Sequence, residues 1–83
     1  MVRPPYGVSP VILRALGRRV EALRLHRGWS QSHLALAAGL TQRGVSFTEA
    51  GKREPMASTL FALAEALGTT PEYLWSGDGG PSA

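Results

Sequence analysis

Apolar residues recur at helical spacing along most of the 83-residue chain, and the first such run predicts a long helix over residues 10–27. Ser9 is the expected N-cap and Pro10 the expected first residue, because proline has no backbone N–H to leave unpaired there. One face of this helix carries an apolar stripe that we expect to be buried. The stripe consists of Leu13, Leu16, Val20 and Leu23.

Two short helices are predicted next, over residues 31–38 and 42–49. Ser30 and Thr41 are residue types that cap helix N-termini, and Gly39 can adopt the left-handed backbone angles that end a helix. The apolar residues of the first short helix share one face: Leu34, Ala35 and Ala38. Two short helices joined by a short turn that contains glycine form a helix-turn-helix.

The remaining apolar pattern predicts a fourth helix over residues 57–67 and a fifth over residues 71–75, with Thr70 as the cap of the fifth. The buried stripe of the fourth consists of Leu60, Leu63, Ala64 and Leu67. No segment alternates like a strand, so the predicted fold is all-α, a compact five-helix bundle with a central helix-turn-helix. We expect a flexible arm over residues 1–9, one domain over 10–75 and a flexible tail over 76–83.

A set of residues in and around the predicted helix-turn-helix has the spacing of a known family. These residues are Ser30-Gln31, Leu34-Ala35, Gly39, Thr41, Val45-Ser46, Glu49, Gly51-Lys52-Arg53 and Pro55. With the flanking segments 16–27 and 60–74, they resemble the phage repressor/Cro-type (XRE-like) helix-turn-helix DNA-binding family. The resemblance covers residues 10–75 and implies a five-helix, lambda-repressor-like domain.

The charge distribution is consistent with a polyanionic partner. The net charge is +3, but all nine lysines and arginines lie at or before Arg53 with only two acidic residues, which gives that part +7, and four acidic residues follow. A basic N-terminal part suits nucleic acid, and the acidic C-terminal part would face away from it. A solvated surface with chance segregation of charge is the alternative.

Other function classes find little support. The chain has no cysteine, and His26 and His33 lack the further ligands that a metal site needs, so we expect no metal and no cofactor. No glycine-rich phosphate loop or nucleophile elbow is present, and we expect no enzyme. No apolar run approaches the ~20 residues that cross a bilayer, and no signal-peptide core is seen, so a cytoplasmic location is expected.

The helix over residues 42–49 carries groups suited to DNA base edges. Glutamine can pair through two hydrogen bonds with adenine and arginine with guanine, and the first turn of a recognition helix meets the bases. The resemblance implies that the base contacts are made by Gln42, Arg43, Gly44 and Phe47. Phe47 stands where the family usually has a polar residue. It could press on a thymine methyl group, or it could turn into the core.

The resemblance also implies which residues hold the DNA backbone. The predicted phosphate contacts are Gln31, Ser46, Lys52 and Arg53. Gln31 is expected at the start of the second helix, where backbone amides favour an anion, and in the family it often braces the first glutamine of the recognition helix. Lys52 and Arg53 resemble the clamp that follows that helix, although a solvated loop is the alternative.

Two structural expectations concern pairs of residues. Arg24 and Glu49 occupy the positions of a charge pair common in the family, so we expect a partly buried ion pair between the first and third helices. Phe61 and Trp75 exceed what so small a core needs and are the predicted dimer interface, although Trp75 could simply cover its own core.

The predicted function is therefore sequence-specific binding of double-stranded DNA by a homodimeric transcription regulator, a repressor of a near-palindromic operator. Two alternatives remain open. One is an antitoxin that binds a toxin and represses its own operon. The other is a protein-interaction module that has kept the fold and lost DNA binding.

Overall fold

The computed structural model describes residues 8–79, and within that range it contains five helices and no strand. The helices are α1 (Pro10–His26), α2 (Gln31–Ala38), α3 (Gln42–Glu49), α4 (Ala57–Leu67) and α5 (Pro71–Ser76). The prediction of an all-α, five-helix fold is confirmed. Residues 1–7 of the predicted arm and 80–83 of the predicted tail lie outside the described residues, whereas Ser9 caps α1 and Ser76 is the last residue of α5.

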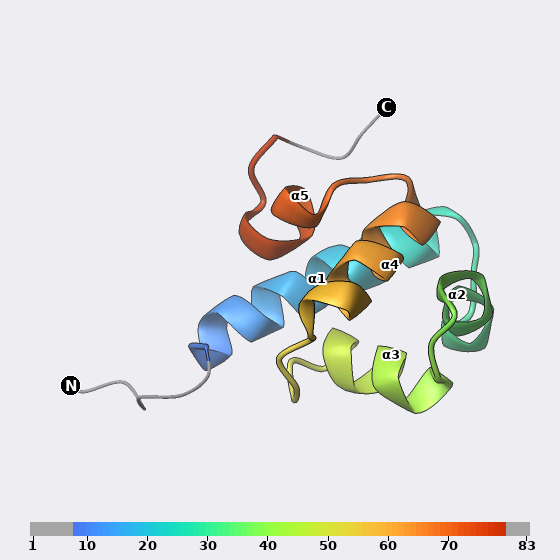
Figure 1. The fold of residues 1–83 in the computed structure, drawn as a ribbon, viewed down its shortest axis with the longest axis horizontal. Helices are drawn as coiled ribbons and strands as arrows, with labels where there is room; N and C mark the ends of the chain where they lie inside the picture. The colour runs from blue at the N-terminus through green and yellow to red at the C-terminus, as the bar shows by residue number, and fades with distance from the viewer. Residues whose placement is uncertain (1–7, 80–83) are drawn as a thin grey trace.

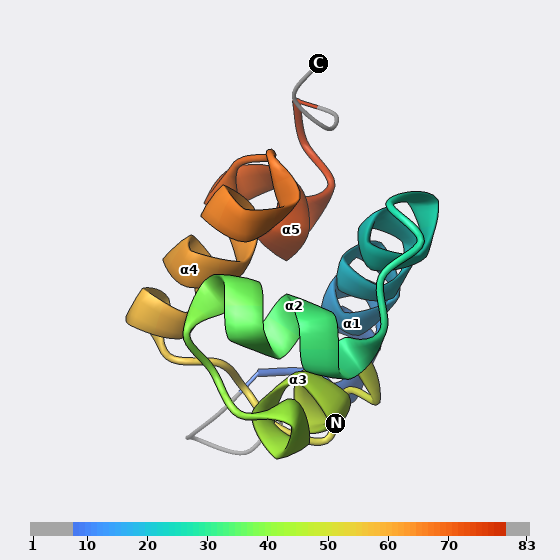
Figure 2. The same cartoon turned by 90° about the vertical axis from the view of Figure 1, so that its right-hand side faces the viewer.

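The longest helix, α1, runs through the bundle and contacts α3, α4 and α5. In Figure 1, α3 and α5 lie on opposite sides of α1, and α4 crosses in front of it. Figure 2 views the molecule from the end at which α2 lies, with α3 beneath it. The two short helices of the helix-turn-helix are thus mounted on one end and one side of the bundle, where α3 remains accessible.

Polar caps fix where four of the five helices begin. Hydroxyl oxygens accept a hydrogen bond from a backbone amide of the first turn at each of these starts, at distances of 3.0–3.2 Å. The capping residues are Ser9, Ser30, Thr41 and Thr70. Gly39 ends α2 with φ of 70°, a left-handed angle that side-chain-bearing residues rarely adopt, and this sets the turn into α3.

The core forms where the apolar stripes of all five helices meet. Its buried members are Leu16, Val20, Leu34, Ala35, Val45, Leu63, Ala64, Leu67 and Leu74. Four residues of the predicted apolar faces are only partly buried: Leu13, Leu23, Ala38 and Leu60. Figure 1 shows that the first turns of α1 extend beyond the other helices.

Gly17 brings α1 and α3 into direct backbone contact. It is buried in the middle of α1, and a Cβ atom there would lie 2.5 Å from the carbonyl oxygen of Thr48 and closer still to that of Glu49. Real Cβ atoms do not approach backbone this closely. A glycine is therefore needed for α3 to lie at its observed distance from α1, and this contact helps to set which face of α3 is exposed.

Candidate nucleic-acid interface

The helix α3 divides into a buried face and an exposed face. Val45 and Thr48 are buried in the bundle, whereas Gln42 and Arg43 in the first turn are exposed. Gly44 and Ser46 are partly buried. Val45 and Thr48 therefore lie on one face of the helix and Gln42 and Arg43 on the other, as the helical period requires. The structure places Gln42 and Arg43 together at the accessible end of α3.

Phe47 lies outside the hydrophobic core. Its side chain is partly buried, and the guanidinium carbons of Arg43 and Arg53 each lie over its ring, 5.1 Å from the centroid. Arg43 precedes Phe47 by one helical turn, and Arg53 comes from the connection that follows α3. Phe47 is thus part of the same surface as the predicted base-contacting and phosphate-contacting arginines.

A buried ion pair fixes the C-terminal end of α3 to α1. Arg24 donates from Nε to Glu49 Oε2 at 2.7 Å and from Nη2 to Glu49 Oε1 at 2.9 Å. The two side chains are 9% and 4% exposed. The hydrogen bond with Glu49 is the main reason that the pKa of Arg24 lies above its ordinary value, although burial opposes it. The structure thus brings together the two residues that the sequence paired.

The same network extends to α2. Arg24 Nη1 donates to the carbonyl oxygen of Trp29 at 2.7 Å, and Gln31 Nε2 donates to Glu49 Oε1 at 3.0 Å. The family pattern suggested that Gln31 braces the first glutamine of α3. In this structure Gln31 instead makes its bracing contact with Glu49. Glu49 lies close because α2 and α3 pack directly on each other, and its charged oxygen is a stronger acceptor than a neutral amide.

The turn after α3 presents two cations beside that helix. Gly51, with φ of 71°, closes the helix end through backbone hydrogen bonds from Gly51 N to the carbonyl oxygen of Thr48 and from Lys52 N to that of Phe47. Lys52 and Arg53 follow at once, and both are exposed. The left-handed glycine turns the chain back toward α3, and Arg53 then lies over the ring of Phe47.

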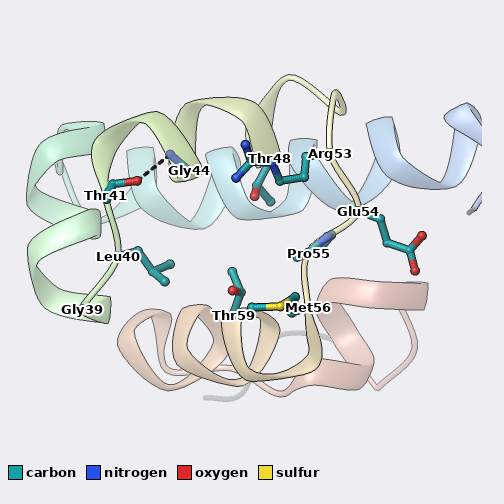
Figure 3. Close-up of a pocket in the computed structure, with 10 residues that line it drawn as sticks. All are labelled: Gly39, Leu40, Thr41, Gly44, Thr48, Arg53, Glu54, Pro55, Met56 and Thr59. Atoms are coloured by element: carbon teal, nitrogen blue, oxygen red, sulfur yellow. Dashed lines mark hydrogen bonds between the residues drawn. The ribbon is translucent and has the colours of Figure 1, made fainter.

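A groove of about 570 Å³ separates α3 from the start of α4. Figure 3 shows Leu40 reaching into it from the turn before α3, and Met56 and Thr59 reaching in from the opposite wall. Arg53 and Glu54 are the charged residues of its lining. Figure 3 also shows Arg53 extending from the connection back along α3 beside Thr48, so this groove and the surface that carries Phe47 share one side chain.

The two predicted dimer residues lie in different environments. Phe61 on α4 is 62% exposed, whereas Trp75 on α5 is partly buried against the core. A shallow hollow of about 580 Å³ between α4 and α5 adjoins Phe61 and includes Ala62 and Pro71. Phe61 is therefore available to a partner, and much of the ring of Trp75 already serves the core of its own chain.

Several contacts were not anticipated from the sequence. Arg19 donates to the carbonyl oxygens of Leu74 and Trp75 at 3.0 and 3.3 Å and so caps the C-terminal end of α5. The rings of Trp29 and His33 stack at a centroid distance of 4.5 Å. The contact of Arg19 with α5 leaves no local signal in the sequence. Gly17 does leave one, because a glycine inside an apolar helical pattern indicates close packing.

Two other site types were tested in the part of the chain that the structure describes. Residues 8–79 contain no group of three or more His, Asp or Glu side chains placed to hold a metal ion. None of the five helices is long and apolar enough to cross a membrane.

The fold and the exposed α3 define a helix-turn-helix protein, and comparison with known sequences gives the family. Residues 20–74 match the helix-turn-helix family, and the chain belongs to it. The resemblance to the phage repressor/Cro-type (XRE-like) proteins is thereby confirmed. The family comprises DNA-binding transcription regulators, which are not enzymes, so the prediction that the chain is not an enzyme is confirmed as well.

Two curated relatives show the extent of the sequence similarity. The chain is 36% identical over 61 residues to the SPbeta prophage-derived uncharacterized HTH-type transcriptional regulator YonR of Bacillus subtilis, covering 74% of this chain and 56% of that protein. It is 40% identical over 55 residues to the uncharacterized HTH-type transcriptional regulator Rv0023 of Mycobacterium tuberculosis, covering 66% of this chain but only 22% of that protein. The chain therefore matches only part of the length of these relatives.

Two solved structures share the fold over most of their length. The restriction-modification controller protein C.AhdI from Aeromonas hydrophila superposes with a TM-score of 0.72 and 35% identity, covering 75% of this chain and 94% of that one. The P22 c2 repressor, solved in complex with a synthetic operator, superposes with a TM-score of 0.73 and 33% identity, covering 76% and 96%. The five-helix arrangement is thus one found in a repressor bound to DNA.

Proposed function

We propose that the chain is a homodimeric transcription repressor that reads double-stranded DNA through α3. The observation that carries the proposal is the exposure of Gln42 and Arg43 at the first turn of a helix whose other face is buried. Their side chains offer the donor and acceptor patterns that match the major-groove edges of adenine and guanine. The similarity to the P22 c2 repressor, which was solved on a synthetic operator, supports this docking.

The mounting of α3 supports a reading role. Three constraints hold the helix: its buried face, the backbone contact at Gly17 and the Arg24–Glu49 ion pair. A reading helix must present its side chains without further rearrangement, because ordering side chains at the moment of binding lowers affinity. The free protein therefore already holds the backbone of the proposed reading helix in place.

The cations beside α3 support a clamping role. Lys52 and Arg53 follow the recognition helix and would neutralise phosphates on either side of the groove that α3 enters. Ser46 could donate its hydroxyl to the same backbone. Gln31 begins α2, whose N-terminal amides favour an anion, so a further phosphate would bind there. In this arrangement the clamp fixes the register and α3 reads the sequence.

The proposed dimer interface lies on α4 and α5. Phe61 is exposed beside the hollow between these helices, and α5 lies on the opposite side of α1 from α3 in Figure 1. An interface centred on Phe61, with Trp75 at its edge, would leave α3 of both copies free. Two recognition helices in successive major grooves would then lie ~34 Å apart.

Selection of bound sequences from a random pool of duplexes, followed by footprinting, tests the proposal. The expected result is an inverted repeat with half-site centres ~10 base pairs apart, protected on one face of the duplex. A single unrepeated site would contradict the dimer while leaving the reading helix intact. Failure to enrich any sequence would contradict the function itself and would favour the protein-interaction module.

A further inference from the structure

One aromatic ring in the candidate interface is shared by two arginines. The guanidinium carbons of Arg43 and Arg53 each lie over the ring of Phe47 at 5.1 Å from its centroid. A cation within ~6 Å of an aromatic face is attracted by the negative charge density of that face. Arg43 reaches Phe47 from one turn earlier in α3, whereas Arg53 arrives from the connection after the helix.

The ring is the main contact that orders these two side chains. Within residues 8–79, no hydrogen bond or ion pair involves the guanidinium of Arg43 or of Arg53, although Glu54 is adjacent in sequence to Arg53. Arg24, by contrast, is ordered by Glu49 and a backbone carbonyl. Two exposed like charges so close together would otherwise separate in solution, so their shared position depends on Phe47.

We propose that Phe47 is the positioning residue of the DNA interface, holding the base-contacting Arg43 and the phosphate-contacting Arg53 as one preorganised unit. This inference rests on the proposed function. A guanidinium that stacks by its face keeps its N–H donors free at its edge, so both arginines can still pair with guanine or phosphate. Phe47 then acts through the arginines, and contact of its ring with a thymine methyl group is not required.

The energetic consequence follows from side-chain entropy. Each rotamer-rich side chain that binding must immobilise weakens association, and two arginines released together should reduce affinity by roughly tenfold. Phe47→Leu keeps an apolar side chain of similar bulk but removes the aromatic face. Phe47→Tyr keeps the face and is the rescue variant. Thermal unfolding of all three proteins establishes that the fold is retained before binding is compared.

The first measurement uses the free protein and no DNA. Side-chain proton NMR signals of Arg43 and Arg53 should be displaced upfield by the ring current of Phe47 in the wild type and in Phe47→Tyr. Both should move to ordinary positions in Phe47→Leu, while the signals of the exposed Arg18 on α1 stay unchanged. If Arg43 and Arg53 have the same shifts in the wild type and in Phe47→Leu, the shared stack does not exist and the proposal is overturned.

The second measurement uses the operator obtained by selection. Phe47→Leu should bind roughly tenfold more weakly than the wild type, and Phe47→Tyr should bind within about twofold of it. The loss in Phe47→Leu should persist on a duplex in which deoxyuridine replaces thymine. If deoxyuridine abolishes the difference between wild type and Phe47→Leu, the ring contacts a thymine methyl directly and positioning is overturned. Absence of any wild-type binding would instead overturn the proposed function, which the NMR result does not depend on.

Discussion

Replacing Glu49 by alanine is the sharpest test of how α3 is held. Glu49 accepts three hydrogen bonds, two from Arg24 at 2.7 and 2.9 Å and one from Gln31 at 3.0 Å. Its side chain is 4% exposed and that of Arg24 is 9% exposed. Glu49→Ala would therefore leave a buried guanidinium without its counter-charge and an amide donor without its acceptor.

The loss of unfolding free energy in Glu49→Ala can be bounded. Breaking a buried ion pair by removing one partner costs ~3–5 kcal/mol, and we expect about 3 kcal/mol, the lower end of that range, for Glu49→Ala. A domain of this size has a total stability of about 4–12 kcal/mol, so the loss is a large fraction of it. At about 4–8 °C per kcal/mol, the midpoint of thermal unfolding should fall by ~12–24 °C.

The matched control is Glu65→Ala, which removes an exposed carboxylate from α4. That change should alter the free energy of unfolding by no more than ~0.5 kcal/mol. Both variants are compared by thermal and by denaturant unfolding at neutral pH. Equal and small losses would refute the reasoning, since they would mean that the Arg24–Glu49 pair contributes nothing beyond an ordinary surface contact.

The contribution of Arg24 has a defined pH dependence. Its pKa is raised in the folded state above its ordinary value, so the folded protein holds this proton more tightly than the unfolded chain does. The stability from this group is complete at every pH below the ordinary pKa of arginine and declines only as the pH rises through the raised folded-state pKa.

Three further substitutions test packing and assembly. Gly17→Ala should destabilise the fold although alanine is the better helix former, because the added methyl group would clash with the backbone of α3. The loss should exceed the ~1 kcal/mol expected for the control Ala22→Gly in the same helix, and a loss below that value in thermal unfolding would contradict the backbone contact. Leu34→Ala should cost ~2–5 kcal/mol, whereas Leu36→Ala on the exposed face of α2 should cost almost nothing, and equal losses in denaturant unfolding would place the core elsewhere. Phe61→Ala should shift sedimentation toward the monomer, and an unchanged dimer would move the interface to another face.

The sequence was sufficient to predict the elements and their ends. Apolar spacing placed all five helices, and Ser9, Ser30, Thr41 and Thr70 cap the helices that they were predicted to cap. These features depend on residues three or four positions apart, which is the range over which sequence patterns act directly. The pairing of Arg24 with Glu49 was available only because the family supplies a partner 25 residues away.

The remaining contacts of the site join residues that are brought together only when the helices pack. The environment of Phe47 includes Arg53, which reaches it only because Gly51 reverses the chain after α3. Similarly, Gln31 binds Glu49 because α2 packs directly on α3, while Gly17 allows α3 to lie close against α1. Such positions follow from packing of several helices at once, and no local pattern encodes them.

The central claim is that α3 reads bases while the turn after it clamps phosphates. Each phosphate contact contributes ~0.9 to the slope of log affinity against log salt concentration, whereas a neutral amide displaces no ion. Lys52→Ala should therefore flatten the slope by about one and weaken binding to operator and scrambled duplexes alike. Gln42→Ala should leave the slope unchanged and cost ~1–3 kcal/mol on the operator alone.

The decisive measurement is a salt titration of wild type, Gln42→Ala and Lys52→Ala on the selected operator and on a scrambled duplex of equal length. We expect Gln42→Ala to lose affinity only for the operator, with relaxed preference at one base pair in each half-site, and Lys52→Ala alone to change the slope. If Gln42→Ala remains folded and weakens both duplexes equally, α3 is not the reading helix, and the account is contradicted.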